Sequence, residues 1–340
     1  MNPTGHPTLS PHRPPGVDTL RYTGRRGLAA VPDPRHRALV AEVLASGLVD
    51  RAIALTDSFD PPVDLAQARA DAAALIAEFA AFGVSVPAAT ARNITLMRAM
   101  MVPIADDALA LALDRIWVFT TNVDDVCCHD RAEAAAILRG GMLPEAGSPN
   151  VRYIRYMFDE VAPFCDPTFL AVFKTYFHTA VAGVLMEAEF TPEAADPVDS
   201  DFVRIFNGFS QFWFTSLQFT DPSLRAEDNR GFWAAALSAG VAFLNDVNDV
   251  LSFYKEAVHG GDFAVSRIHR QSVAGRVPYL TAYRRAVEGG LAAYRRILAL
   301  ASEEQRPHLE RYLTGFAYWH FHCPRYRWQD VYPELTMIEV

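Results

Sequence analysis

Helical periodicity runs through almost the whole chain and leaves little room for other secondary structure. Apolar residues recur at every third or fourth position, which is the spacing of amphipathic helices, whereas the alternation typical of strands is scarce. Proline, glycine and Asp-Pro pairs separate the periodic segments and supply the turn chemistry that ends a helix. We therefore predict an all-α fold. The predicted helices cover residues 36–56, 64–82, 91–101, 104–126, 167–190, 200–219, 230–257, 277–302 and 305–322.

The chain divides into a leader and one helical domain. Residues 1–34 are rich in proline, with several histidines and arginines, a composition typical of a flexible segment. No linker separates the later helices into two groups, although 340 residues would suffice for two ordinary domains. We expect a flexible Pro-rich leader over residues 1–34 and a single α-helical domain over residues 35–340.

Charge and cysteine content restrict the surroundings and the partners of this protein. The net charge of -9 argues against a nucleic-acid partner, and an anionic substrate would need local positive charge or metal ions. The four cysteines are too few and too irregularly spaced for a disulfide framework, which favours a reducing, cytoplasmic setting. No apolar run approaches the roughly 20 residues of a membrane span, so we expect none.

Three polar residues lie at helical spacing in the otherwise apolar segment 230–257. Asn248, Ser252 and Glu256 occupy positions i, i+4 and i+8, so they share one helix face over about 12 Å. An amide oxygen, a hydroxyl and a carboxylate form an all-oxygen ligand set that suits Mg²⁺. A count that starts at Asn245 instead ends at a phenylalanine, which cannot ligate. A solvated polar face is the alternative, but apolar residues on nearly all sides argue against it.

Two adjacent carboxylates, Asp124 and Asp125, lie near the end of a second strongly apolar segment, 104–126. Burial of such a pair is costly unless a cation compensates the charges. The alternative is a helix that ends in water, which the following Asp130 and Arg131 support. Together with the Asn-Ser-Glu triad, the pair predicts a second metal platform on a second helix.

Two arginines near aromatic residues are candidate phosphate contacts. Arg325 and Tyr326 carry donors that suit phosphate oxygens, although an isolated Arg-Tyr pair is usually structural. Arg204 lies just before Gly208, and a glycine costs a helix about 1 kcal/mol relative to alanine. A break at Gly208 would free backbone carbonyl groups beside a cation site, while a small residue at a helix crossing is the alternative.

The metal-type motifs resemble those of class I terpene cyclases. The run Asn-Asp-Val-Leu-Ser-Phe-Tyr-Lys-Glu over residues 248–256 is similar to the second metal motif of this class, above all in the fungal trichodiene synthase family. The aspartate pair Asp124-Asp125 lies about 120 residues upstream, where the class has its aspartate-rich motif. Arg204 lies 44 residues before Asn248, where the class has its diphosphate sensor. The order and the spacing of the motifs agree with the class.

Two further matches extend this resemblance over roughly residues 110–330. Asn207 and Gly208 fall at the linker and effector positions that follow the sensor, which implies a catalytic role for both residues together with Arg204. Trp319 precedes the Arg-Tyr pair at residues 325–326 by six residues, as in the C-terminal motif of the class. The matches therefore span nearly the whole predicted domain.

The resemblance implies a fold, a substrate and a set of metal ions. It predicts a helical bundle around a central apolar cavity, and a lyase of isoprenoid biosynthesis that ionises farnesyl diphosphate with three Mg²⁺ ions and cyclises the carbocation to a sesquiterpene. A homodimer would be ordinary for such a fold. The residues that the resemblance and their placement suggest are the metal ligands Asp124, Asp125, Asn248, Ser252 and Glu256, the diphosphate contacts Arg204, Lys255, Arg325 and Tyr326, and the cavity aromatics Phe119, Phe209, Phe212, Trp213 and Trp319.

The first metal motif departs from the pattern of the class. Members usually carry a further acid three or four residues after the first pair, whereas Cys127, Cys128 and His129 stand here and Asp130 follows. Either the helix ends early enough for Asp130 to return to the site, or Asp124 does most of the bridging. Adjacent residues on a helix point in different directions, so zinc at the Cys-Cys-His run is disfavoured.

Three other functions stay open on this sequence. A monoterpene synthase would use geranyl diphosphate with the same motifs. A chain-elongating prenyltransferase shares the chemistry of metal and diphosphate, but it carries two aspartate-rich motifs, whereas the second motif here is the Asn-Ser-Glu triad. An all-α protein that only binds an apolar ligand would explain the aromatic helices but not the Mg²⁺-type ligands on two of them.

Overall fold

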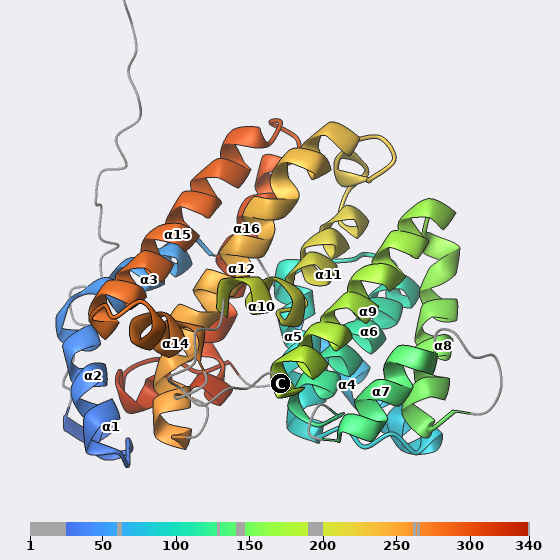
Figure 1. Ribbon diagram of the computed structural model, residues 1–340. Coiled ribbons are helices and arrows are strands. Elements are labelled where there is room, and N and C mark those ends of the chain that lie inside the picture. The colour runs from blue at the N-terminus through green and yellow to red at the C-terminus, as the bar shows by residue number, and fades with distance from the viewer. Residues whose placement is uncertain are drawn as a thin grey trace, which may run out of the picture.

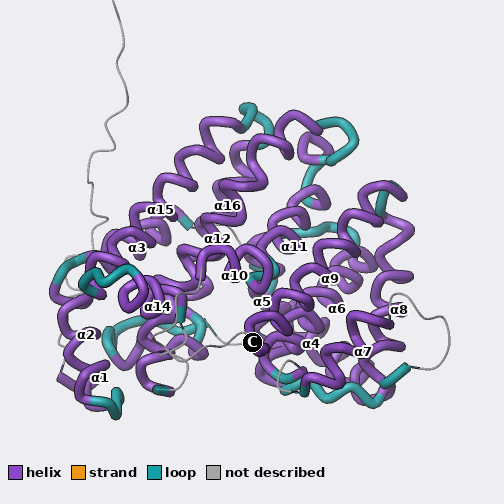
Figure 2. Tube along the Cα trace, in the orientation of Figure 1, coloured by secondary structure: helices purple, strands orange, loops and turns teal. Residues whose placement is uncertain are grey.

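The described part of the chain consists of helices joined by loops. This computed structural model describes residues 25–59, 63–127, 130–140, 147–189, 200–260, 263 and 266–338. Figure 2 shows helices and connecting loops, and no described residue lies in a strand. The prediction of an all-α fold is confirmed.

Most of the predicted helices are present, with ends that differ by a few residues. Aspartate side chains begin several of them, because a carboxylate can accept from the unpaired N–H groups of the first turn. Asp64 accepts from the N–H of Gln67 at 2.9 Å, and Asp106 accepts from the N–H of Leu109 at 3.0 Å. The helices are α1 (Arg25–Ala29), α2 (Pro34–Ala45), α3 (Leu48–Ile53), α4 (Leu65–Phe82), α5 (Ala88–Met101), α6 (Asp107–Asp125), α7 (Arg131–Gly140), α8 (Pro149–Val161), α9 (Pro167–Glu189), α10 (Ser200–Asn207), α11 (Ser210–Thr215), α12 (Arg230–His259), α14 (Arg267–Ala274), α15 (Tyr279–Leu300) and α16 (Arg306–His322).

The predicted helix over residues 36–56 is interrupted. Gly47 has a φ of 72°, and it separates α2 from α3. This left-handed conformation costs glycine little because glycine has no Cβ, and it interrupts the helix. A single periodic stretch of sequence therefore forms two helices.

Four helices were missed by the periodicity analysis, namely α1, α7, α8 and α14. Residues 144–149 read as a break in the sequence, yet Ser148 accepts from the N–H of Val151 at 3.3 Å and so begins α8. Proline at the first helical position is compatible with such a start. Asp130 begins α7 in the same way by accepting from the N–H groups of Ala132 and Glu133. The pairs Ser148-Pro149 and Asp130-Arg131 therefore mark the starts of α8 and α7 as well as breaks in the helical pattern.

The long helix α12 lies at the centre of the contacts between helices. It packs most extensively against α15 and also contacts α16, α11 and α10. In Figure 1, α4 and α6 to α9 lie on one side of the molecule, and α1 to α3, α14 and α15 lie on the other. Helices α10 and α11 lie between these two groups. The face of α12 that carries the Asn-Ser-Glu triad therefore comes close to helices that are distant in the sequence.

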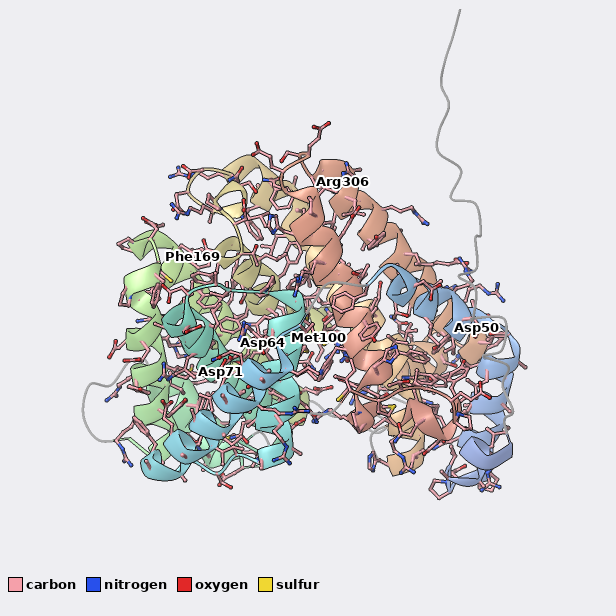
Figure 3. All side chains as sticks on the ribbon, turned by 180° about the vertical axis from the view of Figure 1, so that it is seen from behind. Asp50, Asp64, Asp71, Met100, Phe169 and Arg306 are labelled. Carbon is pink, nitrogen blue, oxygen red and sulfur yellow. The ribbon has the colours of Figure 1, made fainter. Side chains whose placement is uncertain are left out.

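A second connection between the two groups runs through α5 and α16. Figure 3 shows Met100, near the end of α5, beside the α16 ribbon. The Arg311 Nε of α16 donates to the Met100 carbonyl at 2.9 Å, and Arg311 Nη2 donates to the Ala99 carbonyl at 3.3 Å. These bonds satisfy carbonyl groups that the end of α5 leaves unpaired. They hold α16, which precedes the C-terminal Arg-Tyr motif, against α5. Helix α5 in turn packs on α6, the helix that carries the aspartate pair.

Residues of the predicted leader already pack against the helical domain. Residues 1–24 lie outside the described residues, but α1 already packs on α12, because the Tyr254 hydroxyl donates to the Gly27 carbonyl at 2.6 Å. A Cβ on Gly27 would lie 2.9 Å from the Asp330 carbonyl oxygen, so only glycine allows this close approach. Val31 is 0% exposed. Packing against the helical domain therefore includes Gly27 and Val31, which lie within the segment predicted as a flexible leader.

One helix contradicts the expectation that no apolar run approaches the length of a membrane span. Within the described residues, α9 is long and apolar enough over Pro167–Glu187 to cross a membrane by length and composition. A core helix of a soluble protein passes the same test, so a single such helix is weak evidence. Here α9 packs against α10, α7, α11 and α6, and 39% of its most apolar window is buried inside the structure.

Candidate active site

A cavity of about 700 Å³ lies where α6, α9, α10, α12, α14 and the C-terminal turn Pro324–Tyr326 meet. Its wall combines several carboxylates with several guanidinium and ammonium groups, and it contains every residue predicted as a metal ligand or diphosphate contact. These residues are Asp124, Asp125, Arg204, Asn248, Ser252, Lys255, Glu256, Arg325 and Tyr326. The helices therefore bring together motifs that lie up to about 200 residues apart in the sequence.

The triad on α12 presents its oxygen atoms to this cavity. The Ser252 hydroxyl donates to Glu256 Oε1 at 2.6 Å, so these two groups lie side by side as the spacing of four residues requires. Asn248 Oδ1 accepts from Arg204 Nη2 at 2.7 Å. Asn245, the other possible start of the triad, instead accepts from the Ser210 hydroxyl at 2.5 Å, away from the outer cavity. The geometry agrees with the count that starts at Asn248.

His320 on α16 fixes the orientation of the Asn248 amide, and sequence reasoning missed it. Its Nδ1 lies 2.8 Å from the Phe316 carbonyl, so Nδ1 carries the proton and Nε2 is left as an acceptor. The Asn248 Nδ2 donates to that Nε2 at 3.0 Å. Burial, together with the positive charge of Lys255, lowers the pKa of His320 to about 3, which keeps the imidazole neutral. The amide oxygen of Asn248 is thereby turned away from α16.

The two aspartates at the end of α6 have different partners. Both oxygens of Asp125 accept from Arg325, at 2.7 Å from Nη1 and 2.7 Å from Nη2. This bidentate pair ties the C-terminal turn to α6. The Asp124 side chain is exposed to the cavity, yet desolvation by the surrounding protein, and next the charge of Asp125, raises its pKa to about 6. Burial likewise raises the pKa of Glu256 to about 7. A cation bound beside these carboxyl groups would favour their ionised forms and lower both pKa values.

Asp130 does not complete the first metal motif. Its carboxylate caps α7 and is exposed, and it does not line either cavity of the site. Other acids do line the outer cavity, namely Glu187 on α9 and Asp249 on α12. The Asn207 side chain donates to Glu187. Asp249 neighbours Asn248 in the sequence and was a possible signal, whereas nothing in the sequence distinguished Glu187 from other glutamates.

The chain breaks between α10 and α11, which is one of the two alternatives that Gly208 left open, and the predicted continuous helix over residues 200–219 is wrong. Phe209 follows with a φ of 52°, a strained value for a residue with a Cβ. Side chains take up the backbone groups that the break frees, because Gln211 Nε2 donates to the Ile205 carbonyl at 2.7 Å and Asn245 Nδ2 donates to the Arg204 carbonyl at 3.2 Å. These two carbonyl groups therefore take part in hydrogen bonds that hold the turn together.

We predict that Gly208→Ala lowers the free energy of unfolding by about 1–3 kcal/mol, the usual cost of overpacking. A Cβ at this position would lie 3.0 Å from both the Arg204 carbonyl and the Ser210 hydroxyl and would collide with the Asn245 side chain. Urea unfolding measures the change. The control is Gly231→Ala, because a Cβ there meets nothing within 4 Å. Equal stability of Gly208→Ala and the wild type would contradict the prediction.

A second, smaller cavity of about 80 Å³ lies behind the first. Three of the predicted aromatic residues, Phe209, Trp213 and Trp319, line it. The Trp319 Nε1 donates to a backbone carbonyl on α5 at 3.0 Å, which leaves the ring to form the wall. The two cavities share a border of six residues. These are Asp124, Arg204, Asn207, Asn248, Arg325 and Tyr326.

The other two predicted aromatics, Phe119 and Phe212, do not line either cavity. Phe212 stacks on Phe173 with ring centroids 4.2 Å apart, and Phe119 packs beside Tyr153 at 5.3 Å. Both are fully buried in the aromatic core between α6, α9 and α11. Their positions on motif-bearing helices suggested the cavity, but their faces of those helices point to α8 and α9.

The donor atoms of the outer cavity suit a hard cation such as Mg²⁺. Asp124, Asn248, Ser252 and Glu256 offer only oxygen atoms, which Mg²⁺ prefers. Among the described residues no group of three or more His, Cys, Asp or Glu side chains is placed to hold a metal ion of any kind, so the amide of Asn248 and the hydroxyl of Ser252 would have to take part. Cys128 and His129 lie outside the described residues. Burial raises the pKa of Cys127 to about 11, so the metal-free thiol is protonated at neutral pH.

Comparison with known proteins identifies the fold. No protein-family model and no curated protein matches the sequence. The structure is similar to linalool/nerolidol synthase from Streptomyces clavuligerus in complex with 2-fluorogeranyl diphosphate, with a TM-score of 0.61 and 16% identity over 77% of this chain and 97% of that chain. It is also similar to a single-site variant of cucumene synthase, with a TM-score of 0.51 and 15% identity over 80% and 97% of the two chains. The chain has the all-α fold of class I terpene synthases.

Proposed function

We propose that this protein is an Mg²⁺-dependent class I terpene cyclase that ionises farnesyl diphosphate and cyclises the resulting carbocation to a sesquiterpene. One observation carries the proposal. A cavity lined by carboxylates and cations opens onto a cavity lined by aromatic rings, and the border between them contains residues of all the predicted motifs. A molecule with an anionic head and an apolar tail suits such a pair of cavities.

The residues of the outer cavity would bind the diphosphate head. Bound Mg²⁺ would supply positive charge that stabilises the departing diphosphate. Asp124, Asn248, Ser252 and Glu256 are the proposed ligands. Arg204 and Arg325 already point their guanidinium groups into the cavity, because Asp249 and Asp125 hold them there at 3.2 Å and 2.7 Å. Donors that are oriented before the substrate arrives lower the cost of stabilising charge in the transition state.

The residues of the inner cavity would receive the prenyl tail and keep water from the carbocation. Aromatic faces stabilise a nearby cation by ~0.5–2 kcal/mol each without attacking it. The inner cavity of about 80 Å³ is smaller than the pockets of roughly 300–1,000 Å³ that usually hold small ligands. The tail must therefore displace side chains, and Trp213, which is only partly buried, is well placed to move.

The farnesyl chain length and the likeness to the trichodiene synthase family rest on the sequence motifs. Geranyl diphosphate is the second candidate, because the similar linalool/nerolidol synthase was solved with a geranyl diphosphate analogue. A chain-elongating prenyltransferase is disfavoured by the Asn-Ser-Glu triad in place of a second aspartate-rich motif. A homodimer in the cytoplasm is the proposed state.

The test is diphosphate release from geranyl, farnesyl and geranylgeranyl diphosphate, with and without Mg²⁺, together with mass spectrometry of the hydrocarbon products. We expect release and a terpene product from farnesyl diphosphate in the presence of Mg²⁺ only. Asn248→Ala should lower kcat/KM by roughly 100-fold, since it removes one proposed ligand and the hydrogen bond to Arg204. Turnover without metal, or no turnover of any C10 to C20 substrate, would refute the proposal. Condensation with added isopentenyl diphosphate would instead identify a prenyltransferase.

A further inference from the structure

The first turn of α14 forms one wall of the outer cavity and carries two arginines, Arg267 and Arg270. They lie one helical turn apart, and both line the cavity. Carboxylates of α10 and α12 surround Arg267, which lies 3.2 Å from Asp201 and 2.5 Å from Asp249 and also pairs with Asp246. Arg267 therefore fastens α14 to its neighbours, and its charge is compensated.

The charge of Arg270, in contrast to that of Arg267, is not compensated by a described carboxylate. Its side chain is buried, with the residue only 8% exposed, and its Nη2 has no hydrogen-bond partner. Among the residues that the structure describes, no carboxylate forms an ion pair with it. Burial of an uncompensated guanidinium costs several kcal/mol, so such a group points to an anion that binds beside it. Ser266, which caps α14, lines the same cavity, and the N-terminus of a helix also favours an anion.

The position of Arg270 relative to the two cavities indicates which part of an anion it would meet. Arg204, Arg325 and Tyr326 line both cavities, so they lie where a bond between head and tail would be placed. Arg270 and Lys255 line only the outer cavity. In a prenyl diphosphate the phosphate farther from the tail is the terminal one. Residues that line only the outer cavity are therefore placed to meet that phosphate.

We propose that Arg270 binds the terminal phosphate of the diphosphate head, a contact that the sequence motifs do not include. The proposal rests on the proposed function, since it names a further residue of the same site. A planar guanidinium can donate two parallel hydrogen bonds to phosphate oxygens, which suits discrimination between a diphosphate and a monophosphate. A purely structural role does not account for the residue, because Arg267 already holds the helix in place and Arg270 has no described carboxylate to bridge.

The test is calorimetric binding of inorganic diphosphate with Mg²⁺, and separately of farnesyl monophosphate, to the full-length protein. We expect Arg270→Gln to weaken diphosphate binding by roughly 10-fold or more, because a charge-assisted contact is lost. Binding of farnesyl monophosphate should change by less than about twofold. Arg270→Lys should fall between the wild type and Arg270→Gln, because an ammonium is a point charge without the planar fork. Arg284→Gln on the exposed face of α15 is the matched control.

Several outcomes would overturn the assignment. These are diphosphate affinity of Arg270→Gln within twofold of the wild type, equal losses for diphosphate and monophosphate, and no diphosphate binding by the wild type. Thermal melting establishes that Arg270→Gln is folded. If it is not folded, Arg270→Lys decides the question, and wild-type affinity in that variant would refute the proposal. Wild-type protein that binds diphosphate but turns over no prenyl diphosphate would refute the proposed function alone, because the Arg270 comparison uses no turnover.

Discussion

Replacing Asp124 with asparagine should lower kcat/KM for the prenyl diphosphate by roughly 10²- to 10³-fold, the effect typical of removing one preorganised electrostatic contact. Asp124 lines both cavities at the border where the head would leave the tail. Desolvation by the surrounding protein raises its pKa to about 6 although the side chain is exposed to the cavity, so a cation bound beside it would favour the charged carboxylate. Asparagine keeps the size of the side chain but removes this charge. A rise in the Mg²⁺ concentration needed for half-maximal rate should accompany the loss.

Steady-state kinetics over a range of Mg²⁺ concentrations measures both effects. The matched control is Asp130→Asn, which makes the same chemical change six residues away. Asp130 only caps α7, and asparagine caps a helix about as well as aspartate, so this variant should retain wild-type activity. Loss of activity in Asp130→Asn with full activity in Asp124→Asn would show that the first metal motif has been placed on the wrong aspartate.

Replacing Arg98 with methionine should destabilise the protein by about 3–5 kcal/mol, because it leaves a buried carboxylate without its partner. Arg98 on α5 donates to Asp114 on α6 through Nε at 2.7 Å and through Nη2 at 2.8 Å. The two residues are 4% and 0% exposed. Asp71 of α4, visible in Figure 3, lies 3.9 Å from the same guanidinium. The pair thus joins three helices of the group that carries the aspartate motif.

Urea unfolding of the variants measures this difference in stability. The double variant Arg98→Met with Asp114→Leu should recover most of the loss, since apolar residues of similar size replace the whole buried pair. Arg51→Met provides a surface control. Its partner Glu288 lies 3.7 Å away, both side chains are about half exposed, and such pairs contribute at most about 1 kcal/mol. A loss of less than about 1 kcal/mol in Arg98→Met would mean that water or another cation compensates Asp114.

The local sequence sufficed wherever the geometry of one helix decides the outcome. Asn248, Ser252 and Glu256 lie on one face because the helical repeat places every fourth residue on the same side. The break at Gly208 and the caps at Asp64 and Asp106 likewise depend on neighbours in the sequence. Short helices that begin at Ser-Pro or Asp-Arg pairs were harder to predict, because the same residues also end helices.

The sequence by itself determined the all-α fold and the shared face of the triad on α12, and it suggested the residues that we propose hold a cation and a diphosphate, because these follow from side-chain chemistry and helical spacing. Only the tertiary structure decided which helix faces meet. It placed Phe119 and Phe212 in the core, left Asp130 outside the site and brought His320 to the amide of Asn248. It also buried Arg270 without a described partner. These outcomes depend on packing between segments that are distant in the chain, and a periodic pattern within one helix carries no information about its neighbours.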